Sequence, residues 1–219
     1  KIMNVYLNTF IPLAVNKFGR KNANAHNLPP FIDGSCRREP DFQNPFPAIS
    51  QLCRPKKLVP RLSIGDYVIY ITKQGRYGKP SVHWNFIAIL EVVDFAQDHK
   101  QAEAYYLNNK LPISQNIICN QTSPFSLNKT HGWCGFNPDN LTPEKIIVQW
   151  NEVYVERAKA NEKTAITKVW QNHLYLHNPP MITHQKMKEV FGRIPGTQNP
   201  PKLKIDEWMK FENLILNKL

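Results

Sequence analysis

The sequence lacks the features that mark several large classes of protein. Among its 219 residues no apolar run approaches the roughly 20 residues of a membrane span, so we expect no membrane partner. Its start carries no signal-peptide pattern. The four cysteines, Cys36, Cys53, Cys119 and Cys134, do not have the CxxC spacing that many zinc sites use. We therefore expect free thiols, a cytoplasmic location, and neither a bound metal nor another cofactor.

Familiar catalytic motifs are absent as well. The chain contains no HExxH, no phosphate-binding GxxxxGK[ST] and no nucleophile elbow. It also contains no internal repeat and no low-complexity tract. The sequence therefore assigns no catalytic residue.

Acidic residues are few relative to basic ones. The chain has 28 lysines and arginines against 17 aspartates and glutamates, which gives a formal charge of +11 and a pI near 9.5. This balance favours a polyanionic partner, because phosphate contacts dominate the affinity of proteins for nucleic acids. The alternative is a basic soluble protein that binds no nucleic acid.

The hydrophobic pattern predicts an α+β fold, with a small curved mixed β-sheet or β-barrel and flanking helices. Strands are expected over residues 2–11, 66–72, 84–95 and 145–155. Helices are expected over residues 97–109, 183–191 and 206–219, with caps at Thr183 and Asp206 and a stop at Gly192. Residues 17–30 read as a loop, 48–53 as a short apolar turn, and 159–172 as loop and helix.

Two segments carry a resemblance to a known family. Residues 65–70 read Gly-Asp-Tyr-Val-Ile-Tyr, and residues 86–92 read Phe-Ile-Ala-Ile-Leu-Glu-Val. This order resembles the PUA-like superfamily, which includes ASCH, EVE and YTH domains and nucleotide-modification-associated domains. The resemblance covers roughly residues 2–95. It implies one PUA-like domain over 1–219, with a helical C-terminal extension from about 183, and recognition of DNA or RNA.

Such domains hold a modified or unpaired base in a pocket at the barrel mouth, so the resemblance also implies site residues. Trp84 is expected to stack a base, Asn85 to read its edge, and His83 to add a hydrogen bond, although core packing is the alternative for Trp84. The loop expected to close over the ligand contributes Ser35, Arg37, Arg38 and Glu39. The cations expected to contact phosphates are Arg54, Lys56, Lys57 and Arg61.

Two other functions remain open from the sequence. An enzyme acting on nucleotides or nucleic acid, such as a base hydrolase or a nuclease-like protein of phage defence, would use the thiol of Cys36 and the nearby Asp33, Glu39 and Asp41. A regulatory protein would instead use the C-terminal helix as an oligomer interface. The sequence does not choose between DNA and RNA, name a base, or set the oligomeric state.

Overall fold

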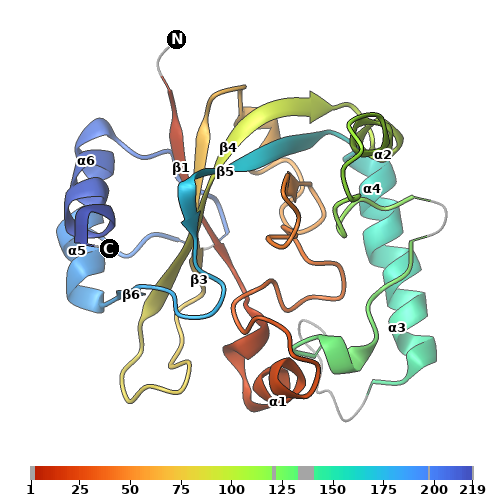
Figure 1. The fold of residues 1–219 in the computed structure, drawn as a ribbon, viewed down its shortest axis with the longest axis horizontal. Coiled ribbons are helices and arrows are strands. Elements are labelled where there is room, and N and C mark those ends of the chain that lie inside the picture. The colour runs from red at the N-terminus through yellow and green to blue at the C-terminus, as the bar shows by residue number, and fades with distance from the viewer. Residues whose placement is uncertain (1–2, 120–121, 133–140, 197, 219) are drawn as a thin grey trace.

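The structure is a computed structural model that describes residues 3–119, 122–132, 141–196 and 198–218. Its centre is a mixed sheet in the order β1-β3-β4-β5-β2, and a short β6 pairs with the start of β4 (Figure 1). The strands are β1 Val5–Phe10, β2 Ala48–Ile49, β3 Tyr67–Thr72, β4 Trp84–Ala96, β5 Thr164–Leu174 and β6 Met181–Ile182. β1 and β3 are parallel, and the other pairs are antiparallel.

The sheet bends because its long central strand is irregular. The pairing of β4 with β5 shifts register at Ala88/Leu90 and again at Val92/Asp94, and its pairing with β3 shifts at Tyr70/Ile71. Such irregularities bend a strand and increase its twist. The predicted α+β class with a small curved mixed sheet and flanking helices is confirmed. The strands expected over residues 66–72 and 84–95 are β3 and β4, which pair antiparallel.

Side chains alternate between two buried faces of the sheet. Leu7 and Ile69 point into a cluster with α5, His184–Phe191, and α6, Ile205–Leu214, whereas Tyr6 and Val68 belong to a cluster on the other face. Figure 1 shows α5 and α6 together on one side of the sheet. Because both faces are covered, the strands are apolar along most of their length.

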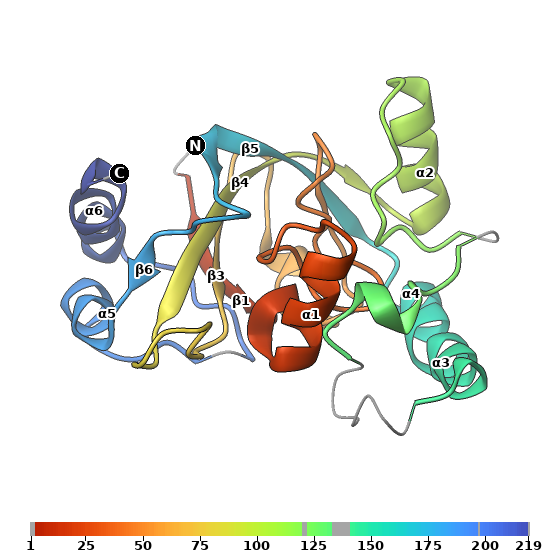
Figure 2. The ribbon, with the colours of Figure 1, turned by 60° about the horizontal axis from the view of Figure 1, so that its bottom comes forward.

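The second face is covered by irregular chain and by outer helices. These helices are α1 Lys17–Ala25, α2 His99–Asn108, α3 Pro143–Gln149 and α4 Glu156–Ala160, with a six-residue π-helical segment, Trp150–Val155, joining α3 to α4. Single 3-10 turns lie at Leu13–Val15, Val59–Arg61, Leu127–Lys129 and Leu216–Lys218. Figures 1 and 2 show the chain between α1 and β3 enclosed between the sheet and these helices.

The predicted strand over 145–155 is wrong, because this segment is part of the helix that runs from α3 to α4. Its buried residues are Ile146, Trp150, Tyr154 and Ala158, which recur every four positions and so form one helical face. Thr142 caps the helix by accepting a hydrogen bond from the Lys145 N–H at 3.4 Å. The abundance of β-branched and aromatic residues hid this helical period.

Four further expectations were wrong. Residues 17–30 include α1, which Asn16 caps by accepting a hydrogen bond from the Gly19 N–H at 2.7 Å. Residues 159–172 contain most of β5 in place of a helix, and residues 48–49 form the edge strand β2. α6 is capped at Lys204, whose N–H donates to Glu207 at 2.8 Å, so Asp206 lies inside its first turn.

The other expected helices are confirmed. α2 falls within residues 97–109, and α5 begins after Thr183 and ends at Gly192, whose φ of 66° suits glycine. No helix among the described residues is both long and apolar enough to span a membrane.

Candidate functional site

A cavity of about 440 Å³ opens beside the end of β1, on the sheet face that carries the irregular chain. Most of its lining surface is apolar, and carboxylates, hydroxyls, an imidazole and cations are set into it. The lining residues are Thr9, Phe10, Ile11, Asp33, Ser35, Glu39, Cys53, Arg54, Pro55, Lys57, His131 and Gln198. A cavity of this size and mixed lining is typical of sites for small organic groups.

The loop that forms one wall is buried without regular structure from Ile32 to Phe42, so its backbone needs side-chain partners. Asp33 supplies one set, because its Oδ1 accepts hydrogen bonds from the N–H of Ser35 at 2.9 Å and from the Ser35 hydroxyl. Arg38 supplies another: it donates to the carbonyl oxygens of Asp33, Ser35 and Lys129 at 2.8, 3.0 and 2.6 Å. Arg38 is therefore a buried clamp for the loop.

Glu39 is a second internal support, and it also faces the cavity. Its carboxylate accepts hydrogen bonds from the N–H and hydroxyl of Ser50, at 2.9 and 2.5 Å, and from Asn116 Nδ2 at 2.7 Å. Burial raises the pKa of the Glu39 carboxyl, although the nearby Arg37 and these hydrogen bonds oppose the shift. Its hydrogen bonds join the loop to β2 and to the chain around Asn116.

Arg37 is only 2 % exposed and lies behind the cavity wall. Its Nη2 contacts the Cys53 sulfur, and its guanidinium carbon lies 4.1 Å from the centre of the Tyr154 ring. Its Nε and Nη1 have no hydrogen-bond partner among the described residues. Arg37 does not line the described cavities, so its predicted contact with a ligand stays a prediction.

His131 closes the cavity on the side of the loop. Its N–H donates to the Gly34 carbonyl at 2.9 Å, and its Nε2 is buried without a partner in the described part of the chain. Burial lowers the pKa of the His131 imidazole, while the nearby Asp33 acts in the opposite direction. The ring is therefore neutral at neutral pH, and it can donate from one nitrogen and accept at the other.

The predicted phosphate contacts divide into two groups. Arg54 and Lys57 line the cavity, and Arg54 donates to Asn8 Oδ1 at 2.8 Å and to Thr9 Oγ1 at 3.0 Å. Lys56 lies outside it, and Arg61 donates to the Pro200 carbonyl at 2.8 Å with its guanidinium over the Tyr6 ring. Lys57 is exposed, which leaves its ammonium group accessible at the rim.

The predicted base-reading residues lie in another part of the molecule. Trp84 is 3 % exposed, belongs to the core beneath α5, and has its ring 6.2 Å from that of His184. His83 bonds the Ser81 carbonyl at 3.0 Å, and the N–H of Asn85 donates to Thr72 at 2.9 Å. None of the three residues lines a described cavity. Their role in ligand binding therefore stays a prediction.

The thiols and acidic groups of the loop have structural partners. The Cys36 side chain is buried in the cluster that contains Leu52 and Trp150. Cys53 as a whole is exposed, but its sulfur atom is buried against Arg37. This burial raises the pKa of the Cys53 thiol, although the positive charge of Arg37 acts in the opposite direction. Asp41 accepts hydrogen bonds from backbone N–H groups of Gln43 and Gln115. In the described part of the chain, no three His, Cys, Asp or Glu residues are grouped to hold a metal ion.

Sequence reasoning missed the cavity's far side. Thr9 and His131 join the lining, and Asn116 donates to Glu39 behind it, across long stretches of chain, and no local pattern marks these positions. The one available signal was composition: a loop with Asp33, Arg38, Glu39 and Asp41 within a few residues must pair its charges if it is buried.

Comparisons with known proteins give one distant similarity. No protein-family model matches the chain, and no curated protein matches it significantly. Among solved structures, a mutant of the ZmASCH protein from Zymomonas mobilis is similar, with a TM-score of 0.41 and 10% identity over 96% of this chain and 95% of that one.

Proposed function

We propose that this protein is a nucleic-acid-binding module that takes an unpaired or modified base into the cavity beside β1. The observation that carries the proposal is the combination of a few buried polar groups in a mostly apolar lining with cations at the same opening. Asp33, Ser35 and His131 supply acceptors and donors, while Arg54 and Lys57 supply positive charge. The net charge of +11 favours the approach of a polyanion.

The chemistry of the lining suits the edge of a base. A base presents ring nitrogens, carbonyl oxygens and amino groups, which need both donors and acceptors from the protein. Both described hydrogen bonds of the Asp33 carboxylate go to Oδ1, so Oδ2 is the oxygen that remains to accept from an amino group. Within the lining of this cavity, His131 Nε2 is a further buried polar atom that has no hydrogen-bond partner among the described residues. Lys57 would contact the phosphate that follows the base.

The proposal places the base near Asp33 and His131 and not near Trp84. Trp84 could stack a base only if α5 moved, because its ring is packed beneath that helix. Phe10 is the aromatic residue on the cavity floor, and it is held by ring contacts with Phe42 at 5.1 Å and Tyr70 at 6.3 Å. Recognition here therefore depends on hydrogen bonds to the base edge more than on stacking.

The test is a fluorescence anisotropy titration with labelled single-stranded and double-stranded DNA and RNA over a series of salt concentrations. We expect single strands to bind more tightly than duplexes, because a paired base cannot enter the cavity. We expect log K to fall linearly with log salt. Lys57→Ala should weaken binding to all sequences and reduce the salt slope by about 1.

Lys210→Ala is the matched control. Lys210 is exposed on α6, on the opposite face of the sheet, so its loss removes the same charge away from the cavity. Ser35→Ala tests whether the cavity distinguishes bases, since it should change the order of the affinities for the different homopolymeric strands. Equal effects of Lys57→Ala and Lys210→Ala, or no salt-dependent binding at all, would contradict the proposal.

A further inference from the structure

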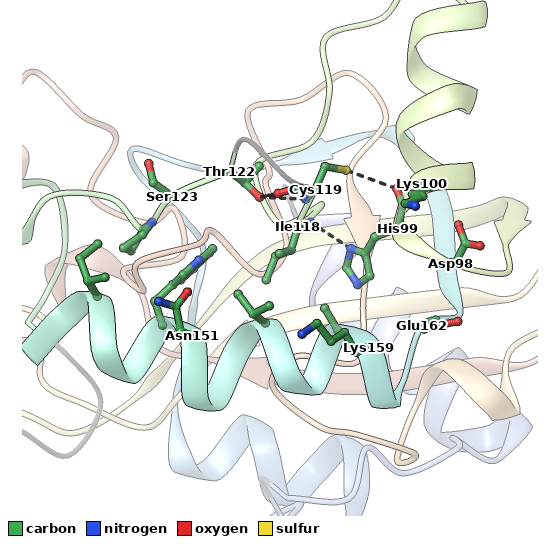
Figure 3. Close-up of a pocket in the computed structure, with 15 residues that line it drawn as sticks. Asp98, His99, Lys100, Ile118, Cys119, Thr122, Ser123, Asn151, Lys159 and Glu162 are labelled. Carbon is green, nitrogen blue, oxygen red and sulfur yellow. Dashed lines mark hydrogen bonds between the residues drawn. The ribbon is translucent and has the colours of Figure 1, made fainter.

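A second cavity, of about 710 Å³, lies between the start of α2, the chain around Ile118 and the helix from α3 to α4 (Figure 3). It shares no lining residue with the cavity beside β1. Its lining residues are Asp98, His99, Lys100, Ile118, Cys119, Thr122, Ser123, Pro124, Ile147, Trp150, Asn151, Val155, Ala158, Lys159 and Glu162.

His99 is the buried polar group of this cavity. The residue is 5 % exposed, and its Nδ1 accepts a hydrogen bond from the Ile118 N–H at 3.0 Å. A nitrogen that accepts carries no proton, so the proton of the neutral ring is on Nε2. Nε2 has no hydrogen-bond partner among the described residues. Figure 3 shows the ring beside Ile118, with both side chains facing the long helix that carries Asn151 and Lys159.

The imidazole stays neutral at ordinary pH. Burial lowers the pKa of His99 to about 4, although the adjacent Asp98 acts in the opposite direction. A neutral ring with a fixed proton on Nε2 is a directed donor. Burial of an N–H without an acceptor costs free energy, so a group that accepts from it would be stabilised at this position.

The remaining walls set the character of that group. Trp150, Ile118 and Val155 give a broad apolar surface with one large aromatic ring. The charged lining residues balance, with Asp98 and Glu162 against Lys100 and Lys159, and Lys159 is already paired with Glu156 at 2.8 Å. No surplus of either sign is present among these residues to favour an ion.

The backbone at Trp150 adds an independent observation. The helix has π geometry over Trp150–Val155, beside the cavity. The side chains of this segment therefore point in other directions than they would in a regular α-helix. Short π-helical segments inside α-helices occur frequently at functional sites. Here the segment contributes Trp150, Asn151 and Val155 to the lining.

We infer that this cavity binds a small neutral planar ligand, whose carbonyl oxygen or ring nitrogen accepts from His99 Nε2–H while its ring packs on Trp150. The ligand class is that of neutral heteroaromatic amides and lactams. The site is separate from the cavity proposed for nucleic acid and does not depend on it.

The experiment titrates the protein with nicotinamide and uracil as neutral probes and with nicotinate as the anionic comparator. Binding is followed by tryptophan fluorescence and by imidazole ¹H–¹⁵N NMR. We expect saturable binding of a neutral probe, a shift of the His99 Nε2–H signal, and weaker binding of nicotinate. The NMR signal locates the probe at His99 even without a variant.

His99→Asn is the informative variant, because the amide oxygen can replace Nδ1 as acceptor for Ile118 while the Nε2 donor is lost. We expect affinity to fall about 10-fold or more. His184→Asn, at an exposed histidine on α5, is the matched control and should bind as the wild type does. Lys57→Ala should also leave probe binding unchanged, which separates this test from the oligonucleotide experiment. Absence of binding by both neutral probes, or equal affinity in the wild type and His99→Asn, would overturn the inference.

Discussion

The imidazole of His131 occupies the space that a side chain at Gly34 would need. A Cβ atom added to Gly34 would lie 2.2 Å from His131 Cδ2 and 2.8 Å from the Cα of Leu13. The two residues are also joined through the backbone, since the His131 N–H donates to the Gly34 carbonyl. This close approach brings the imidazole to the wall of the cavity that holds Asp33 and Ser35.

Gly34→Ala should therefore destabilise the protein and displace His131. The added methyl group meets backbone as well as a side chain, so relaxation of the ring alone cannot accommodate it. Overpacking of this kind costs typically about 1–3 kcal/mol. The measurement is the free energy of unfolding in urea, with Gly196→Ala as the control because, among the described residues, Gly196 has open space where a Cβ atom would lie. Equal stability of the two variants would contradict the packing described for His131.

Glu39→Gln should also destabilise the fold, although it preserves the shape of the side chain. One carboxylate oxygen accepts from the Ser50 N–H and the other from Asn116 Nδ2. The NH₂ group of a glutamine would therefore stand opposite one of these N–H donors, with no acceptor there. Asn116 cannot turn over to help, because its Nδ2 also donates to the Ala48 carbonyl and its Oδ1 accepts from Ser114. An unsatisfied buried donor costs about 1–3 kcal/mol.

Chemical denaturation of Glu39→Gln checks this expectation, and Glu189→Gln on the exposed face of α5 is the control. The control should stay within about 0.5 kcal/mol of the wild type. If Glu39→Gln were as stable as the control, the hydrogen bonds to Ser50 and Asn116 would not be holding the loop.

Phe211→Ala should cause a large loss of stability through the other face of the sheet. The Phe211 ring is fully buried, with its centre 5.4 Å from that of Phe86 on β4 and 6.0 Å from that of Trp208. Removal of a buried phenylalanine side chain costs about 3–5 kcal/mol. Met209→Ala is the control, because Met209 is on the same helix and 54% exposed. Similar melting temperatures for both variants would mean that α6 is not docked on the sheet.

The parts of the fold that could be predicted from the sequence are those whose partners are near in the chain. The hairpin of β3 and β4 has strong β-branched runs joined by a turn, and α5 has a cap at Thr183 and a stop at Gly192. Local chemistry is sufficient for such elements. The helix around Trp150 was misread because its composition favours strands, whereas packing against Cys36 and Leu52 selects the helical face.

The candidate site was predictable only in part. The charges of Arg37, Arg38 and Glu39 marked their loop as part of a site. In the structure, Arg38 and Glu39 use their charged groups to hydrogen-bond the loop and its neighbours. Trp84 resembled a stacking residue because it stands at the start of a strand beside polar residues. Its burial is decided by α5 and α6, which follow about a hundred residues later and whose docking no local pattern reveals.

The buried His99 should make the stability of the protein depend on pH. Burial lowers the pKa of His99 to about 4 in the folded state, whereas histidine in an unfolded chain has a pKa near 6.5. Between these values the unfolded state binds the proton that the folded state excludes, so stability falls as the pH decreases through this window. The contribution is fully present above about pH 6.5. Its loss reaches roughly 1 kcal/mol near pH 5.5 and about 3 kcal/mol near pH 4, as an upper estimate.

The pH dependence of the wild type is compared with that of His99→Asn, because other groups titrate in the same range. The charged residues that line the cavity with His99 are Asp98, Lys100, Lys159 and Glu162, and all four are present in both proteins. Subtraction of the two urea-unfolding curves at each pH therefore isolates the histidine. We expect the wild type to lose more stability than His99→Asn between about pH 7 and pH 4.5. Parallel losses in the two proteins would mean that His99 is solvated in the folded state, and its Nε2–H would then not be a buried donor.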